Sequence, residues 1–427
     1  MKLVICTPSY WPERNGVGTV ATTLAERFAE MGSDVTVLAP RRDDRFCREA
    51  HGGVVVIPVN TTGRGTLLRP YGGDVDGYRR LLHDLNADIY LFICWENWLV
   101  DCAAEAFRTI PGKKVLASHG TSAWWRPPGL RGLARQLEYV PHGLRYPRLL
   151  PEFDHFIFLT KLADRGRFYD KLLSEQQHLS NWTTIPNGSD MAMSTGSSQA
   201  FRERHHLGND FVILCVGNFH WAKNQAALIR AFLQAQLKGA TLVLVGHKEN
   251  SYARKLHRLS AQVNQHDQRV LFLMKQSRGD IADAYSAADL YASASITEAQ
   301  PLSILDAMVS GTPFLSLDVG CVREFEGGVV VKNKLEFVYE LKSLAADQVR
   351  RARLGAAGRE VCAQVYNWDR TAQAYHRTFQ RLLTGGAGGE DRPIGSFASL
   401  DTADEGAILC SDAILRQPLG DVGRDEQ

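Results

Sequence analysis

The sequence predicts an α/β protein with two domains, each built on a doubly wound parallel sheet. Short apolar runs rich in β-formers alternate with amphipathic helical patterns along most of the chain, which is typical of parallel sheets covered by helices. A segment rich in Gly, Ser and Asn at residues 187–201 separates two such series, a composition that favours a flexible hinge. The 427 residues are enough for two full cores. We therefore expect two Rossmann-like domains facing each other across a cleft, with ligands at the carboxyl ends of the strands.

The first series predicts an N-terminal domain over residues 1–190. Its clearest helix covers residues 18–31 and ends at Gly32, a residue type that commonly caps helices. Its strands are expected at residues 2–7, 34–38, 54–57, 88–94, 113–118, 155–159 and 183–185. Residues 191–208 are expected to form the hinge.

The second series predicts a C-terminal domain over residues 209–366. Its strands are expected at residues 211–216, 241–245, 270–273, 290–292 and 313–317. Its helices are expected at residues 224–237, 251–263, 278–288, 301–310 and 334–344. From residue 385 onward the periodicity is lost, so residues 385–427 are expected to be largely disordered.

Composition excludes several classes of protein. The 49 basic and 47 acidic residues nearly balance, so no nucleic-acid partner is implied. No apolar run approaches the length of a membrane span, and the first residues read as a strand that stops at Pro8 rather than as a secretory signal. The eight scattered cysteines contain no CxxC pair, which favours free thiols in a reducing cytoplasm and suggests no metal site.

The most informative stretch is residues 297–313, with the sequence TEAQPLSILDAMVSGTP. It places Glu298 in a loop, Pro301 at the first turn of a helix and Asp306 inside that helix. The free N–H groups of a first helical turn bind anions, so this end suits a diphosphate, while Glu298 would accept sugar hydroxyl protons and Asp306 would reach a ribose. The alternative is an ordinary core helix, since its many apolar residues would also suit burial.

Further candidates follow other expected strands. Gly16 and Gly18 open a helix, where backbone can approach a ligand closely. His119 lies at the mouth of a strand, and Asn218 directly follows the first strand of the second series. Lys223 stands at the start of a helix, where its ammonium adds to the helix dipole against an anion. Each residue taken singly also has an ordinary structural interpretation.

An ordered set of motifs resembles the retaining glycosyltransferases of family 4, which have the two-domain GT-B fold. The motifs are NGVGTV, LAERFAEMGSDVTVLAP, SHG, IPNG, GNFHWAKN, YSAADLYASAS, TEAQPLSILDAM and YNWDRTAQAYHRTFQRLL. The likeness covers residues 1–384. It implies that residues 367–384 form a last helix that crosses back to the first domain.

The resemblance also implies roles for the candidate residues. His119 would contact the transferred sugar, Lys223 would hold the diphosphate and Glu298 would bind sugar hydroxyls, and these three are the expected catalytic residues. The expected donor-binding residues are Gly16, Gly18, Asn218, Lys223, Glu298, Ala299, Gln300, Leu302, Ser303 and Asp306. The family usually has Glu where this chain has Asp306 and often Arg where it has Asn218, so one diphosphate cation is missing. The implied reaction is same-face sugar transfer with retention, without a metal or any other cofactor.

The acceptor is marked only by residues 124–150, which interleave five arginines with aromatic residues. This composition suits docking on anionic lipid headgroups, which would bring a lipid-linked or glycan acceptor to an enzyme at the inner face of the cytoplasmic membrane. The alternative is a solvated helix with Leu133, Leu137 and Val140 packed inward.

The function that follows is sugar transfer from a nucleotide sugar in cell-envelope glycolipid or polysaccharide assembly. Two alternatives stay open: a GT-B nucleotide-sugar epimerase, and a degenerate subunit that binds a nucleotide sugar or a partner enzyme. A nicotinamide dehydrogenase is disfavoured, because no GxGxxG follows the first strand and Pro40, Arg41 and Arg42 stand where its acid is needed.

Overall fold

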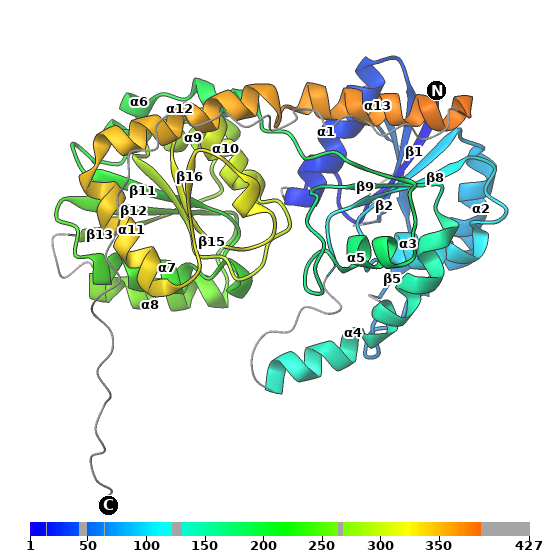
Figure 1. The fold of residues 1–427 in the computed structure, drawn as a ribbon, viewed down its shortest axis with the longest axis horizontal. Helices are drawn as coiled ribbons and strands as arrows, with labels where there is room; N and C mark the ends of the chain where they lie inside the picture. The colour runs from blue at the N-terminus through cyan, green and yellow to red at the C-terminus, as the bar shows by residue number, and fades with distance from the viewer. Residues whose placement is uncertain (14, 42–48, 64, 122–129, 264–267, 386–427) are drawn as a thin grey trace, which may run out of the picture. The chain divides into compact units, whose positions relative to one another are not determined.

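The computed structural model describes residues 1–385 except 14, 42–48, 64, 122–129 and 264–267. Its strands form one eight-stranded sheet, one six-stranded sheet and a small two-stranded hairpin (Figure 1). Helices cover the two large sheets, so the predicted pair of doubly wound α/β sheets is confirmed.

The first sheet has the strand order β10-β9-β8-β7-β1-β2-β4-β3, and its strands pair in parallel except for β3 with β4. The chain winds outward from β1 in one direction and then, from β7, in the other. The strands are β1 (Lys2–Cys6), β2 (Asp34–Pro40), β3 (Glu49–His51), β4 (Val54–Val59), β7 (Ile89–Ile93), β8 (Lys113–Ser118), β9 (His155–Phe158) and β10 (Trp182–Thr184). All seven predicted strands are present. The short edge strand β3 and the hairpin of β5 (Thr61–Thr62) and β6 (Gly72–Gly73) lack the length to show a periodicity.

The second sheet is wholly parallel, in the order β13-β12-β11-β14-β15-β16. Here the winding direction reverses between β11 and β14. The strands are β11 (Phe211–Val216), β12 (Ala240–Gly246), β13 (Gln268–Met274), β14 (Leu290–Ser293), β15 (Phe314–Leu317) and β16 (Gly328–Val331). The five predicted strands are confirmed, and β16 is an additional edge strand.

The helices lie mainly between consecutive strands. Those of the first half are α1 (Gly16–Glu30), α2 (Val75–Leu85), α3 (Trp98–Ala103), α4 (Leu130–Leu149) and α5 (Tyr169–Gln176). Those of the second half are α6 (Ser198–Arg204), α7 (Gln225–Ala235), α8 (Ser251–Val263), α9 (Arg278–Ala287), α10 (Leu302–Ser310), α11 (Lys334–Ala346), α12 (Gln348–Gln364) and α13 (Trp368–Thr384). Short 3-10 turns are η1 (Ala104–Ala106), η2 (Leu150–Glu152), η3 (Met191–Thr195), η4 (Trp221–Lys223) and η5 (Val322–Glu324). No helix in the described ranges combines the length and the apolar character needed to cross a bilayer.

The segment expected to be a hinge is more structured than its composition suggests. It contains η3 and α6, and Met193, Phe201 and Leu207 are buried in the core beside the second sheet. These three apolar side chains, spread through a polar segment, give too weak a periodicity to be recognised in the sequence. The domain boundaries and the hinge at residues 191–208 stay predictions.

The chain leaves the first sheet after β10 and returns from the second in α13, and these two passages touch. The N–H and Oγ of Ser189 donate to the carbonyl of Tyr366 over 2.8 and 2.7 Å. At Gly188 a side chain would have no room, because a Cβ would lie 2.3 Å from the nitrogen of Trp368. Helix α13 then packs on α1 through the rings of Tyr375 and Phe379 against Phe28. It ends at a left-handed glycine, Gly385, and the rest of the expected disordered tail lies outside the described residues.

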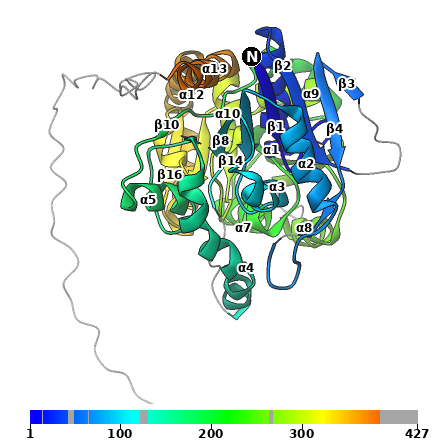
Figure 2. The ribbon, with the colours of Figure 1, turned by 90° about the vertical axis from the view of Figure 1, so that its right-hand side faces the viewer.

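Helix α4 extends away from the rest of the first half, as Figures 1 and 2 both show. The alternative in which Leu133 and Leu137 pack inward is wrong, because both side chains are exposed. Val140 is partly buried. Residues 124–129 of the basic and aromatic stretch lie outside the described residues.

Candidate functional site

Lys223 and Glu298 meet where the second sheet reverses its winding. Strands β11 and β14 are parallel neighbours, so the segments that follow them emerge at the same edge of the sheet. The Nζ of Lys223 lies 2.7 Å from Oε1 of Glu298, and both side chains keep some contact with solvent. The two residues predicted to bind the diphosphate and the sugar are therefore in direct contact.

Backbone hydrogen bonds tie the loop that carries Glu298 to the segments that follow β11 and β15. The N–H of Ile296 donates to the carbonyl of Ala222 over 2.8 Å, and the N–H of Cys321 donates to Ala299 over 2.9 Å. Gly320 fits behind the loop only because it has no side chain: a Cβ would lie 2.3 Å from the carbonyl oxygen of Ala299. The loop that carries Glu298 is thus fixed from both sides.

The start of α10 presents backbone donors beside this pair. Four backbone N–H groups here donate to no acceptor among the described residues. They belong to Ala299, Gln300, Leu302 and Ser303. Pro301 is the N-cap residue and contributes no donor. Such a cluster of unpaired N–H groups at a helix N-terminus attracts anions.

Two buried tyrosines fix this first turn. The hydroxyl of Tyr291 donates to Oγ of Ser303 over 2.8 Å, and that of Tyr285 donates to the Ser303 carbonyl over 2.9 Å. Both phenols lie in the core. The orientation of the N–H groups is therefore set by the protein before any ligand arrives.

Asp306 lies one helical turn beyond Leu302 and Ser303, on the same face of α10. Burial raises the pKa of its carboxyl group to about 7, and the nearby charge of Arg278 opposes this only in part. Near neutral pH this group is a mixture of carboxylic acid and carboxylate, so it can both donate and accept a hydrogen bond. Its predicted contact with a ribose stays a prediction.

His119 follows β8 and is buried. Burial, and then the charge of Arg167, lower the pKa of its imidazole to about 4, so the ring is neutral at physiological pH. Its Nε2 has no hydrogen-bond partner among the described residues. A neutral imidazole with one unused nitrogen suits a hydroxyl group of a sugar.

Sequence reasoning missed the residues that hold the His119 loop. Ser118 hydrogen-bonds to the buried carboxyl group of Asp170, and its Oγ also accepts the N–H of Gly120 over 3.1 Å. Arg167 donates to the carbonyl of His119 over 3.3 Å. No local pattern links positions about fifty residues apart, so the sequence carries no signal for this network.

The remaining candidates differ in their surroundings. A Cβ at Gly16 would meet nothing within 4 Å, so this position leaves space for a ligand. Gly18 is required by packing inside the protein, because a Cβ would lie 2.8 Å from Oγ of Ser9. Its N–H already donates to Oδ1 of Asn15, the N-cap of α1, over 2.9 Å. Asn218 is exposed, and its carbonyl accepts from Gln225 over 3.1 Å.

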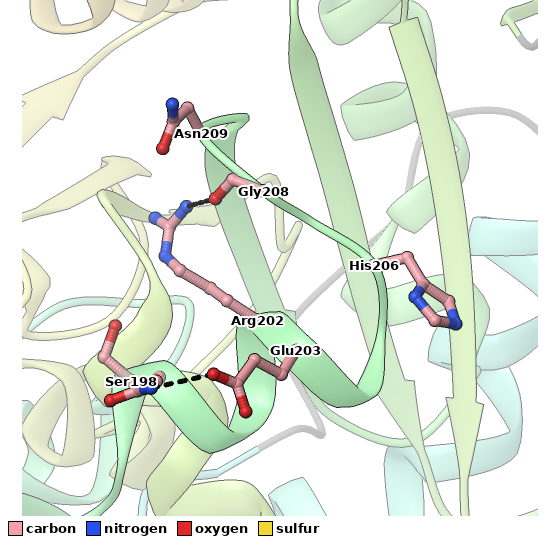
Figure 3. A pocket seen from close by; sticks show the side chains of 7 residues that line it. Ser198, Arg202, Glu203, His206, Gly208 and Asn209 are labelled. Carbon is pink, nitrogen blue, oxygen red and sulfur yellow. Dashed lines mark hydrogen bonds between the residues drawn. The ribbon is translucent and has the colours of Figure 1, made fainter.

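A surface hollow lies elsewhere, beside α6 and the segment leading into β11 (Figure 3). Its charged side chain Arg202 is occupied, because it donates to the Gly208 carbonyl over 3.1 Å and pairs with Asp289 over 3.0 Å. The hollow is at the amino-terminal edge of the second sheet, whereas Lys223 and Glu298 are at the carboxyl-terminal edge. The candidate site is therefore the one at the carboxyl-terminal edge. Among the described residues no group of three or more His, Cys, Asp or Glu side chains is placed to hold a metal ion.

The two parallel sheets covered by helices define an α/β protein of GT-B fold. Two family models match consecutive parts of the chain. The model described as Glycosyltransferase Family 4 matches residues 14–191, and the one described as Glycosyl transferases group 1 matches residues 197–361. The chain belongs to glycosyltransferase family 4.

Two curated relatives match over 199 and 220 residues. A D-inositol 3-phosphate glycosyltransferase from Xylanimonas cellulosilytica is 34% identical over 199 residues, which are 45% of this chain and 46% of the relative. A protein of the same name from Stackebrandtia nassauensis is 29% identical, over 47% of this chain and 49% of the relative. The chain thus spans about half the length of the curated relatives that it matches.

Solved structures share the fold over most of the chain. Sucrose-phosphate synthase from Thermosynechococcus elongatus superposes with a TM-score of 0.73 and 17% identity, covering 90% of this chain and 99% of that one. HepE from Anabaena in complex with UDP-glucose gives a TM-score of 0.68 and 18% identity, covering 89% and 99%. At such low identity the likeness supports the fold.

Proposed function

We propose that this protein transfers a sugar from a nucleotide-sugar donor to an acceptor hydroxyl group, with retention of configuration and without a metal ion. The observation that carries the proposal is the contact between Lys223 and Glu298 beside the unpaired N–H groups at the start of α10. One cation, one carboxylate and a set of backbone donors are what a diphosphate joined to a sugar requires.

In this proposal donor binding rearranges the ion pair. The diphosphate takes the ammonium of Lys223 and the N–H groups of the first turn, and Glu298 then accepts hydroxyl protons from the sugar. Stabilising the negative charge that develops on the leaving diphosphate is the main electrostatic contribution to such a reaction. No side-chain nucleophile is required when the leaving group itself takes the proton of the acceptor on the same face of the sugar.

His119 completes the donor side. Its ring is neutral, and its unpaired Nε2 offers one hydrogen bond to a hydroxyl of the transferred sugar. Because Asp170 and Ser118 act on the backbone beside it, we regard them as positioning residues. Asp306 is proposed to meet the ribose directly or through water.

The acceptor is proposed to be a cell-envelope glycolipid or polysaccharide. The names of the curated relatives point to a second candidate, a phosphorylated polyol such as inositol 3-phosphate. Incubating the protein and its donor with each acceptor class, and analysing the products by mass spectrometry, distinguishes the two. A donor converted to its epimer without any acceptor, detected by chromatography or NMR because epimers have equal mass, would instead indicate an epimerase.

The first test is a thermal-shift panel with UDP, GDP, ADP and their sugars. A ligand at about 100 times its Kd adds about 2.7 kcal/mol to the free energy of unfolding, which gives a clear shift in Tm. We expect one nucleotide to stabilise the wild type and Lys223→Ala to lose that shift. Lys342→Ala, at an exposed lysine on α11, is the matched control and should keep it. No shift with any nucleotide would contradict the proposal and favour a degenerate subunit.

A further inference from the structure

Helix α4 carries a row of exposed leucines. Leu130, Leu133, Leu137 and Leu144 expose 85%, 41%, 55% and 65% of their surface. Their spacing of three, four and seven residues places them on one face of the helix. A soluble surface rarely gathers this many large apolar side chains along one line.

The opposite face of α4 is anchored by polar contacts. His142 is buried, with Nδ1 3.2 Å from Oδ2 of Asp101, and Arg145 reaches the same oxygen over 2.8 Å. The hydroxyl of Tyr146 donates to Oε1 of Glu96 over 2.6 Å. These contacts set the rotation of the helix, so the leucine row faces outward because of the protein's own architecture.

A second segment adds two more exposed leucines. Leu67 and Leu68 expose 63% and 79% of their surface. Their loop is fastened to α4, because the N–H of Leu67 donates to the Glu138 carbonyl over 3.1 Å and Thr66 Oγ1 donates to the Glu138 carboxylate over 3.0 Å. We call the set of Leu67, Leu68, Leu130, Leu133, Leu137 and Leu144 the leucine surface.

The charges beside the leucine surface are positive. Arg69 follows Leu68 and is exposed, and Arg148 stands one turn beyond Leu144 on the same face of α4 and is exposed too. The acid in the sequence of α4, Glu138, already accepts a hydrogen bond from Thr66. Exposed leucines flanked by arginines are the pattern of a helix that lies in the interface of an anionic bilayer.

We propose that the leucine surface docks this protein on an anionic phospholipid membrane, with the leucines among the acyl chains and Arg69 and Arg148 at the phosphates. A second copy of the chain fits this surface less well. A two-fold dimer would bring the same arginines together, and Pro141 and Pro147 interrupt the regular helix that a coiled coil needs. The docking does not depend on the proposed transfer reaction.

The test is co-sedimentation with vesicles of equal parts phosphatidylglycerol and phosphatidylcholine. We expect the wild type to bind, and Leu133→Asp with Leu137→Asp to lower the partition coefficient by about tenfold or more. Leu335→Asp, at an exposed leucine on α11, is the matched control and should bind like the wild type. Arg148→Gln should weaken binding to these vesicles and have little effect with pure phosphatidylcholine.

Three outcomes would overturn the proposal: no binding by the wild type, equal binding by the double leucine variant, or a wild-type dimer in sedimentation velocity that the double variant dissociates. The last outcome would assign the surface to a second copy. Circular dichroism and the Tm verify that the double variant is folded, since its two positions are exposed. The nucleotide panel is measured separately, so a failed donor assignment does not affect the vesicle result.

Discussion

Each of the central residues has its chemical state set by its surroundings. Lys223 and Glu298 hold each other at 2.7 Å, His119 is kept neutral by burial and by Arg167, and the carboxyl group of Asp306 is shifted toward its protonated form. In the proposed site, these four side chains serve as a cation, an acceptor and two groups that can hydrogen-bond without carrying a full charge. Experiments on single residues test these assignments most directly.

Replacing Glu298 should separate catalysis from folding. Glu298→Ala removes the proposed sugar acceptor, so we expect kcat/KM to fall by about 10²–10³-fold, while nucleotide binding persists because Lys223 becomes free for the phosphates. Initial rates and isothermal titration with the nucleotide measure the two effects. Near-normal turnover in Glu298→Ala would remove this residue from the site.

Asp306 should make the stability depend on pH. The folded pKa of about 7 lies above the unfolded value of about 3.9. The folded state therefore binds more protons between these values, and this contribution to stability is lost as the pH rises from 4 through 7. The side chain of Asp306→Asn cannot titrate. The free energy of unfolding of this variant, relative to that of the wild type, should therefore increase between pH 5 and pH 8. Urea unfolding at both pH values measures this, and parallel changes in the two proteins would contradict it.

At the scale of elements, the sequence predicts the strand ends beside the candidate residues and does not predict the contacts that hold them. The strands that precede His119, Lys223 and Glu298 were predicted from short β-rich runs, and the motif order then indicated the family. The hydrogen bond between Ser118 and Asp170 joins two separate elements, and Gly320 approaches Ala299 closely only in the tertiary structure. Sequence periodicity reports which face of an element is buried, and it does not report which elements touch.

Gly320 provides the prediction at this scale. Its φ is +58°, and an added Cβ would meet the carbonyl of Ala299. Gly239 has a φ of +59° with nothing within 4 Å of such a Cβ, so it carries the same backbone cost of about 1 kcal/mol without the clash. We expect Gly320→Ala to weaken nucleotide binding by about tenfold, roughly 1.4 kcal/mol, and Gly239→Ala to leave it unchanged. Equal affinities would show that the loop does not depend on this packing.

At the scale of the whole molecule, the loop that carries Glu298 and Gln300 is tied to the segment that connects the two sheets. The buried N–H of Asn187 donates to Oε1 of Gln300 over 2.6 Å, and Asn187 lies beside the Ser189 contact with Tyr366 described above. The resemblance implies only that Gln300 is one of the donor-binding residues. Its side-chain contact spans 113 positions in the chain, and for that reason no motif reveals it.

Removing the hydrogen bond between Asn187 and Gln300 should destabilise both the loop that carries Gln300 and the segment around Asn187. Gln300→Ala leaves a buried N–H unpaired, which costs about 1–3 kcal/mol. We expect faster amide hydrogen exchange at residues 185–190 and a weaker response to nucleotide. Gln199→Ala, at an exposed position on α6, is the control. Unchanged exchange at residues 185–190 would show that the two regions are independent.

The ion pair at the start of α10 also bears on ligand choice. Any anion that binds the Lys223 ammonium must compete with the carboxylate of Glu298, which already pairs with it. When inorganic phosphate or a bare nucleotide displaces the Glu298 carboxylate from Lys223, the carboxylate gains no new hydrogen-bond partner. A nucleotide sugar would supply hydroxyl groups that donate to the displaced carboxylate. If the proposed donor site is correct, this pair of side chains favours a nucleotide sugar over inorganic phosphate.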